Sequence, residues 1–71
     1  MTYDEMVRTE SPRWVVVDLT TNEIIAEEWS WTYADFAALD AEQERYMHSI
    51  RIYDRMDEND CARLAYFKKG V

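Results

Sequence analysis

Cysteine, glycine and proline are nearly missing from this chain, which has one residue of each type among its 71. With Cys61 alone, no internal disulfide can form, and no cysteine–histidine cluster can hold a structural zinc ion. Because Gly70 is the only glycine, the glycine-rich loops that bind nucleotides are excluded. We therefore expect no cofactor, and a fold held together by apolar and aromatic packing.

Long apolar runs are also lacking. The longest strongly apolar runs, Trp14–Val17 and Ile24–Ala26, are far too short to span a membrane. The first eight residues are charged and contain no apolar run of the kind found in signal peptides. A single cysteine fits a reducing compartment. We therefore expect a cytoplasmic protein that does not contact membranes.

What the chain does contain is typical of a folded domain. Hydrophobic residues make up 48% of it and aromatic residues 14%, far from the composition of a disordered chain. The length allows one domain. We place this domain at residues 12–71 and expect a flexible arm at residues 1–11.

The first half predicts a β-hairpin followed by a helix. Residues 13–19 and 23–30 are rich in β-branched and aromatic residues, as strands are, and Asn22 suits a left-handed turn position between them. Alternation would place Val15 with Val17 on one face, and Ile24 with Ala26 on one face.

A helix is expected to begin near Thr32, which can cap it, with Asp35 close to the positive end of the helix dipole. Four large apolar residues recur at helical spacing and would form its buried stripe. They are Phe36, Leu39, Tyr46 and Met47.

The last third allows two interpretations. Ile50 and Ile52 alternate with other residues, and residues 62–67 also alternate, which predicts two further strands that form a C-terminal β-hairpin, in a small single-domain α+β fold of the order ββαββ. In the alternative, ββαα, the central helix continues past Ile50, and a second helix starts at Asp57 or Asn59 and ends at Gly70. We favour the four-stranded arrangement because a two-stranded sheet alone is marginally stable.

Positively charged lysine and arginine side chains are absent from a long segment of the chain. Residues 18–44 contain eight acidic residues and no lysine or arginine, within a chain whose net charge is −7. The basic residues gather in the last third, so the domain is bipolar and could associate head to tail. Phosphate binding needs lysine and arginine, so direct contact with nucleic acid or an anionic membrane is disfavoured.

No group of residues predicts catalysis. His48 has no serine or cysteine neighbour at a recognisable spacing, and the acidic residue next to Cys61 weighs against a nucleophilic thiol. Residues 54–60 lack the glycine that a calcium-binding EF-hand loop requires. No pair of carboxylates stands out for acid–base work in so small a domain. We therefore expect a protein that is not an enzyme.

The acidic segment itself has three interpretations: a charged surface that confers solubility, a face that docks on a basic protein surface, or a mimic of nucleic-acid phosphates. Its charge density is about half of the one charge per ~1.7 Å of a duplex, which weighs against the third. Aromatic residues within the segment favour the second, since they are common at interface hot spots. The residues that we assign to this face are Glu27, Glu28, Trp29, Trp31, Asp35, Asp40, Glu42 and Glu44.

From these patterns we expect a small acidic binding protein that inhibits or modulates a larger protein with a basic surface. Many phage-encoded inhibitors of host enzymes, including enzymes that handle nucleic acids, are small, acidic and free of cofactors, which is an analogy of class only. The alternative is a homo-oligomeric accessory domain, for example a homodimer, that self-associates through its tryptophans and a sheet edge and has a solvated acidic surface.

Overall fold

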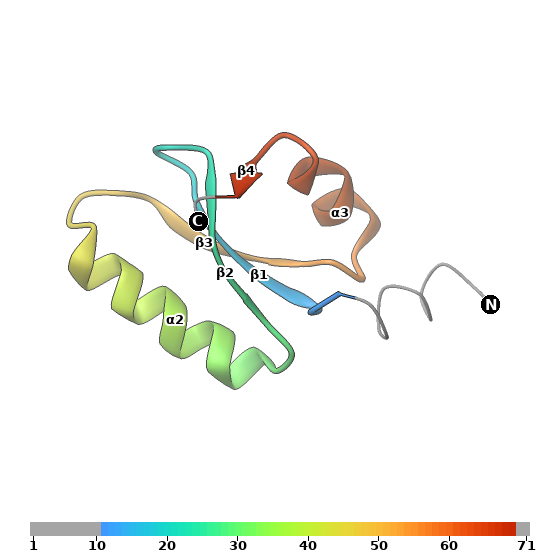
Figure 1. Cartoon of the computed structure of the whole chain (residues 1–71), viewed down its shortest axis with the longest axis horizontal. Helices are drawn as coiled ribbons and strands as arrows, with labels where there is room; N and C mark the ends of the chain where they lie inside the picture. Colours follow the sequence, from blue (N-terminus) through green and yellow to red (C-terminus); the bar gives the residue numbers. More distant parts are fainter. Residues whose placement is uncertain (1–10, 70–71) are drawn as a thin grey trace.

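The computed structural model describes residues 11–69. Its elements are β1 (Trp14–Asp18), β2 (Glu23–Glu28), α2 (Trp31–Glu44), β3 (Ile50–Asp54), α3 (Glu58–Leu64) and β4 (Lys68–Lys69). They form an α+β domain in which four strands lie in the order β3-β1-β2-β4 (Figure 1). The expected α+β class, the N-terminal hairpin and the central helix are confirmed. The predicted arm falls almost wholly outside the described residues.

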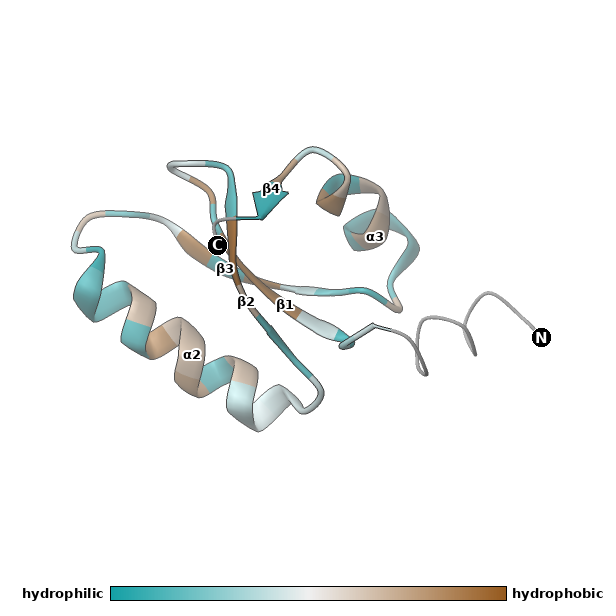
Figure 2. Ribbon diagram, viewed as in Figure 1, coloured by the Kyte–Doolittle hydropathy of each residue, from teal (hydrophilic) through white to brown (hydrophobic). Residues whose placement is uncertain are grey.

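Strand β1 lies inside the sheet and is covered on both faces. Val15 and Val17 pack on one side with Tyr53, Leu64 of α3 and Phe67. Val16 packs on the other side against α2. Figure 2 shows the apolar ribbon concentrated in the central strands. Burial on both faces explains why three valines follow one another without a polar residue between them.

The β1–β2 hairpin turns at Asn22, whose φ of 61° confirms the expected left-handed position. A bulge interrupts the register between Val16 and Val17, where Val16 faces Ala26 and Val17 faces Ile24. The extra residue reverses the alternation of β2. The prediction that Ile24 and Ala26 share a face is therefore wrong: Ile24 packs beside α3 and Ala26 beneath α2.

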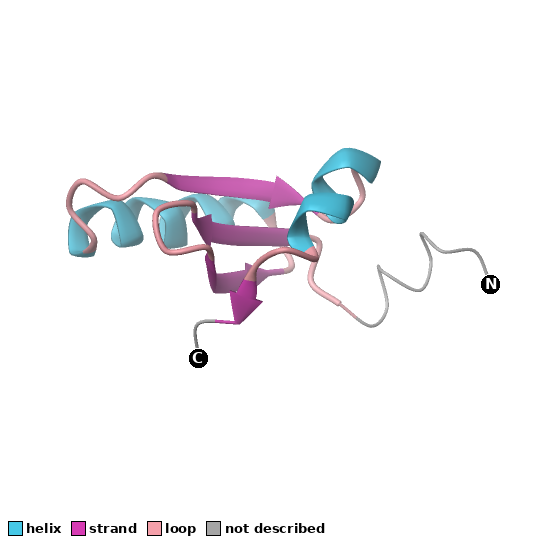
Figure 3. Cartoon of the chain, turned by 90° about the horizontal axis from the view of Figure 1, so that it is seen from above, coloured by secondary structure: helices cyan, strands magenta, loops and turns pink. Residues whose placement is uncertain are grey.

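The two C-terminal strands do not pair with one another. Strand β3 pairs antiparallel with β1, and β4 pairs parallel with β2 (Figure 3). Residues 58–64, part of which we expected to be a strand, form the helix α3 instead. It begins as the alternative interpretation expected, because the Asp57 side chain accepts a hydrogen bond from the backbone N–H of Asp60 at 2.9 Å.

Helix α2 packs with its small residues inward. Its buried residues are Ala34, Ala38 and Ala41, which recur at the i, i+4, i+7 spacing of a single helix face. Side chains this small let the helix backbone approach the sheet closely. The predicted buried stripe is wrong: Phe36 and Leu39 are exposed on α2, and Tyr46 and Met47 are exposed beyond its end.

The start of α2 also differs from the prediction. Ser30 is the N-cap, and its hydroxyl accepts from the backbone N–H of Tyr33 at 3.2 Å. Thr32 is already within the helix, so it is not the cap. Asp35 lies beyond the first turn, which contains no acidic residue. Its carboxylate therefore gains little from the helix dipole, whose effect fades within one turn.

Candidate protein-binding surface

The most unusual surface of the molecule is the side of α2 that points away from the sheet. Three apolar side chains on it are largely exposed: Tyr33 (65%), Phe36 (58%) and Leu39 (49%). They follow one another at intervals of three residues, so each is a neighbour of the next along the helix. We call these three residues, together with the four carboxylates of α2 described next, the outer face of α2.

Helix α2 carries four carboxylates and no basic residue. Asp35 and Asp40 lie four residues from Leu39 and Phe36, respectively, so apolar and acidic side chains are interleaved. Within residues 11–69, none of the four carboxylates takes part in an ion pair. The last two, Glu42 and Glu44, lie close to the C-terminus of the helix, where a negative charge is unfavourable. The four carboxylates are Asp35, Asp40, Glu42 and Glu44.

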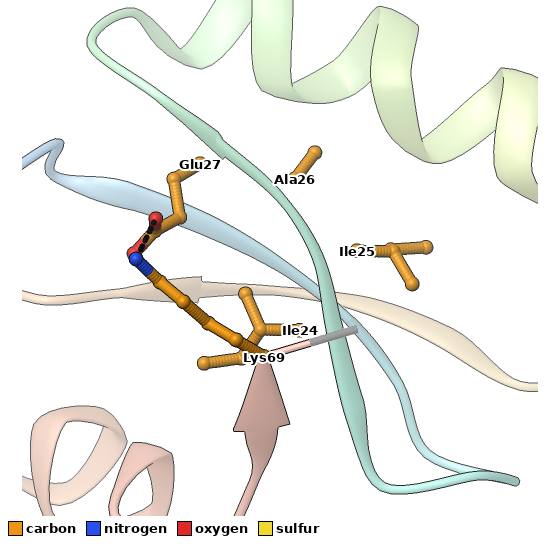
Figure 4. Close-up of a pocket in the computed structure, with 5 residues that line it drawn as sticks. All are labelled: Ile24, Ile25, Ala26, Glu27 and Lys69. Carbon is orange, nitrogen blue, oxygen red and sulfur yellow. Dashed lines mark ion pairs between the residues drawn. The ribbon is translucent and has the colours of Figure 1, made fainter. Parts of the chain in front are cut away.

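The Glu27 side chain does not lie on the outer face of α2. Its carboxylate pairs with Arg55 at 2.8 Å and with Lys69 at 3.5 Å, and Figure 4 shows the Glu27 and Lys69 side chains meeting beside β4. The hydrogen bond from Arg55, together with the two positive charges, lowers the pKa of Glu27 despite its partial burial. It faces Val15 across the ladder, so it lies on the α3 side of the sheet, away from α2.

The other predicted residues surround the start of α2. Glu28 ends β2 opposite Trp14. Trp29 follows it and is 60% exposed, and Trp31, the first residue of α2, is 51% exposed. Seven of the eight predicted residues therefore lie at the last position of β2, in the turn that follows it, or on α2. The eighth, Glu27, has its side chain on the opposite face of the sheet. Sequence reasoning missed the surface role of Tyr33, Phe36 and Leu39, although the alanine spacing indicates it.

The acidic segment is also partly neutralised from within. Asp18 is fully buried at the end of β1. Its Oδ2 accepts from Arg45 at 3.0 Å and lies 2.7 Å from Nδ1 of His48, while Oδ1 accepts from the backbone N–H groups of Thr20 and Thr21. Burial alone would raise the pKa of Asp18, but the hydrogen bonds from His48, Arg45 and the two amides outweigh it and lower that pKa.

This buried cluster ties the turn after α2 to the end of β1. An aspartate that orients a histidine is also part of hydrolase triads. Within the described residues, however, no serine, threonine or cysteine side chain hydrogen-bonds to the His48 ring. Through one carboxylate, the cluster joins the end of β1 to Arg45, at the end of α2, and to His48.

Residues 11–69 include a small groove and no group of metal-binding side chains. A groove of about 110 Å³ runs along β2, lined by Ile24–Glu27 and Lys69 (Figure 4). It is well below the roughly 300 Å³ at which ligand pockets begin. In the same residues, no three His, Cys, Asp or Glu side chains are grouped so that they could hold a metal ion. Neither helix of the described chain is long and apolar enough to cross a membrane.

Comparisons of the chain with family models, with curated proteins and with solved structures found no match.

Proposed function

We propose that this chain is a small non-enzymatic binding protein that inhibits or modulates a larger protein, and that it binds through the outer face of α2. The observation that supports the proposal is the inverted packing of this helix, with alanines inward and large apolar residues outward. Contiguous exposed apolar surface on a small domain commonly marks an interaction site. Trp29 and Trp31 add aromatic side chains of the kind that dominate binding energy.

The distribution of charged residues in this chain indicates the chemistry of a fitting partner. The basic residues Arg45, Arg55 and Lys69 neutralise Asp18, Glu23 and Glu27 within the molecule. Within residues 11–69 the carboxylates of α2 have no such partners, so unneutralised negative charge lies beside the exposed apolar residues. A fitting partner is therefore a protein with an apolar site bordered by lysine or arginine, toward which these carboxylates would steer the encounter.

The same charges disfavour the homodimer through this face. Two copies docked by α2 would bring together eight carboxylates, four from each helix, with no basic residue on either helix. Like-charge contact costs binding free energy. A purely solvated surface would account for the carboxylates, but it gives no reason for Tyr33, Phe36 and Leu39 to lie outside while alanines lie inside.

The test is partner capture followed by quantitative binding. A partner identified by capture is titrated with the native chain, with Phe36→Ser and with Asp40→Lys. Since hot-spot residues contribute at least about 2 kcal/mol, Phe36→Ser should weaken binding by more than about tenfold. Asp40→Lys should slow association and reduce its dependence on salt.

Two exposed residues near the other helix serve as matched controls. Tyr66→Ser and Glu58→Lys make the same kinds of change on α3 or just after it, and both should leave binding unchanged. Full binding by both α2 variants would disprove the proposal. Sedimentation of the chain alone tests the alternative, because a dimer that Phe36→Ser dissociates would establish self-association instead.

A further inference from the structure

In the sheet that residues 11–69 form, strand β3 lies at one margin and pairs only with β1 (Figure 3). Two main-chain hydrogen bonds show which way its residues point. Leu19 N–H donates to the Ser49 carbonyl at 2.7 Å, and Arg55 N–H donates to the Arg13 carbonyl at 2.7 Å. Main-chain groups along an antiparallel strand alternate in direction. The odd-numbered residues of β3 therefore bond to β1, and the even-numbered residues direct their N–H and C=O groups away from the sheet.

One of the even-numbered residues is satisfied within the molecule. Asp54 N–H donates to the Asp60 carboxylate at 3.0 Å, and the Asp54 carbonyl accepts from Asp57 N–H at 2.9 Å. In the described chain, the outward main-chain groups of Ile50 and Ile52 have no such partner. Two donors and two acceptors are thus presented on an edge strand, which is the arrangement to which an extended peptide adds as a further strand.

Arg51 determines what can pair with this edge. It lies between the two isoleucines, is exposed, and has its guanidinium 5.0 Å from the centre of the Tyr53 ring. Among residues 11–69, it makes no ion pair. A cross-strand neighbour opposite an arginine is favoured when it is acidic and disfavoured when it is basic.

A second copy of the chain fits this edge poorly. In the symmetric register that satisfies both Ile50 and Ile52, Arg51 faces Arg51 of the other copy, which is destabilising. In the symmetric register centred on Ile52, Ile50 faces Asp54, whose main-chain groups are already engaged. In the register centred on Ile50, Ile52 faces His48, whose N–H already donates to the Arg45 carbonyl. Self-pairing therefore loses either charge complementarity or hydrogen bonds.

We propose that the outer edge of β3 binds an extended segment of another protein as an antiparallel fifth strand, with an acidic residue opposite Arg51 and an apolar residue on each side of it. The Ile50 and Ile52 side chains are half-buried in the cluster beneath α2. The apolar residues of the added strand would lie beside them and extend this cluster. The edge is separate from the outer face of α2, so this inference does not depend on the function proposed above.

The probe is the capped peptide Thr-Val-Glu-Val-Thr, added to the full chain and followed by NMR. At near-saturating peptide, amide hydrogen exchange at Ile50 and Ile52 should slow by about tenfold, because their N–H groups become bonded. Exchange at Val16, in the middle of the sheet, should not change. A peptide with N-methyl groups on both valines keeps the side chains and loses the donors, and it should not bind.

Charge reversal tests the role of Arg51. The native chain should bind the peptide with Lys in place of Glu about threefold more weakly, and Arg51→Glu, at an exposed position, should reverse that preference. The proposal is overturned if the Glu peptide does not bind, or if Arg51→Glu leaves the preference unchanged. It is also overturned if sedimentation finds a dimer in which the Ile50 and Ile52 amides are already protected, because a second copy would then occupy the edge.

Discussion

Replacement of Asp18 by asparagine tests the buried cluster at the end of β1. The asparagine carbonyl can still accept from the backbone N–H groups of Thr20 and Thr21. Its amide group, however, would face two donors, Arg45 and His48, where the carboxylate accepted from both. The buried negative charge is lost together with two charge-assisted hydrogen bonds.

The expected cost follows from the number of bonds and the burial. Hydrogen bonds to charged groups contribute about 1.5–3 kcal/mol each. The Arg45 and His48 side chains are about one-third exposed and can turn toward water, so the lower end applies. We expect Asp18→Asn to lower the free energy of unfolding by about 3 kcal/mol, a large share of the roughly 5 kcal/mol at the lower end for small domains. Urea unfolding at pH 7 measures it.

The loss of stability caused by Asp18→Asn should become smaller as the pH falls. Because the pKa of Asp18 is lowered in the folded state, its ionised form stabilises the fold above the ordinary aspartate pKa near 3.9, and this stabilisation is lost as pH falls through the folded-state pKa. The difference between native chain and variant should therefore be larger at pH 7 than at pH 3.

The control is Asp40→Asn, which removes an exposed carboxylate that has no ion pair in the described chain. It should change stability by less than about 0.5 kcal/mol. If Asp18→Asn unfolds at the same urea concentration as the native chain, or if the gap does not narrow at low pH, the assignment of Asp18 as a stabilising buried anion is refuted.

Three further substitutions test local features by thermal or urea unfolding. Met47 has a left-handed φ of 72°, which strains a residue other than glycine, and its side chain is exposed. Met47→Gly should therefore stabilise the fold by about 0.5–1 kcal/mol. A loss of stability would contradict the strain. Ser30→Ala should cost about 1 kcal/mol by removing the cap of α2, whereas Thr32→Ala should cost much less; the reverse order would restore Thr32 as the cap. Ala38→Leu should lower the free energy of unfolding by about 1–3 kcal/mol, because the larger side chain forces α2 away from the sheet. Phe36→Ala should lower it by less than about 0.5 kcal/mol. A larger loss for Phe36→Ala than for Ala38→Leu would mean that the helix faces the other way.

The elements that the sequence predicts well are those with strong local signals. The valine run of β1 and the alternation at Ile50 and Ile52 each predict a strand, and both strands are present. Asn22 predicts the hairpin turn, and its left-handed backbone confirms it. Seven residues are too few for periodicity to separate a helix from a strand, so residues 58–64 were ambiguous. Only the signals for a helix start at Asp57 or Asn59 and for a helix end at Gly70 favoured the helix.

The orientation of α2 was mispredicted because large apolar residues were given more weight than small ones. Phe36 and Leu39 have more surface to bury, but the alanine face lets the helix lie closer to the sheet over Val16 and Ala26. The burial of Asp18 could not be predicted locally, since its partners Arg45 and His48 lie 27 and 30 residues further along the chain. The candidate surface was predicted in outline by its acids and tryptophans, while its apolar centre was not.

The parallel pairing of β4 with β2 has a consequence for the order in which the molecule assembles. The β1–β2 hairpin and α2 join neighbours in sequence, whereas Lys68 and Lys69 pair with Glu23 and Ile24, each 45 positions earlier in the chain. Strand β3 closes a loop of similar length, but it pairs five residues with β1, whereas β4 pairs only two exposed residues with β2 and is therefore held less firmly. We therefore expect β4 to dock last in folding and to open first from the native state, releasing Lys69 from Glu27 while the β3-β1-β2 ladder stays closed.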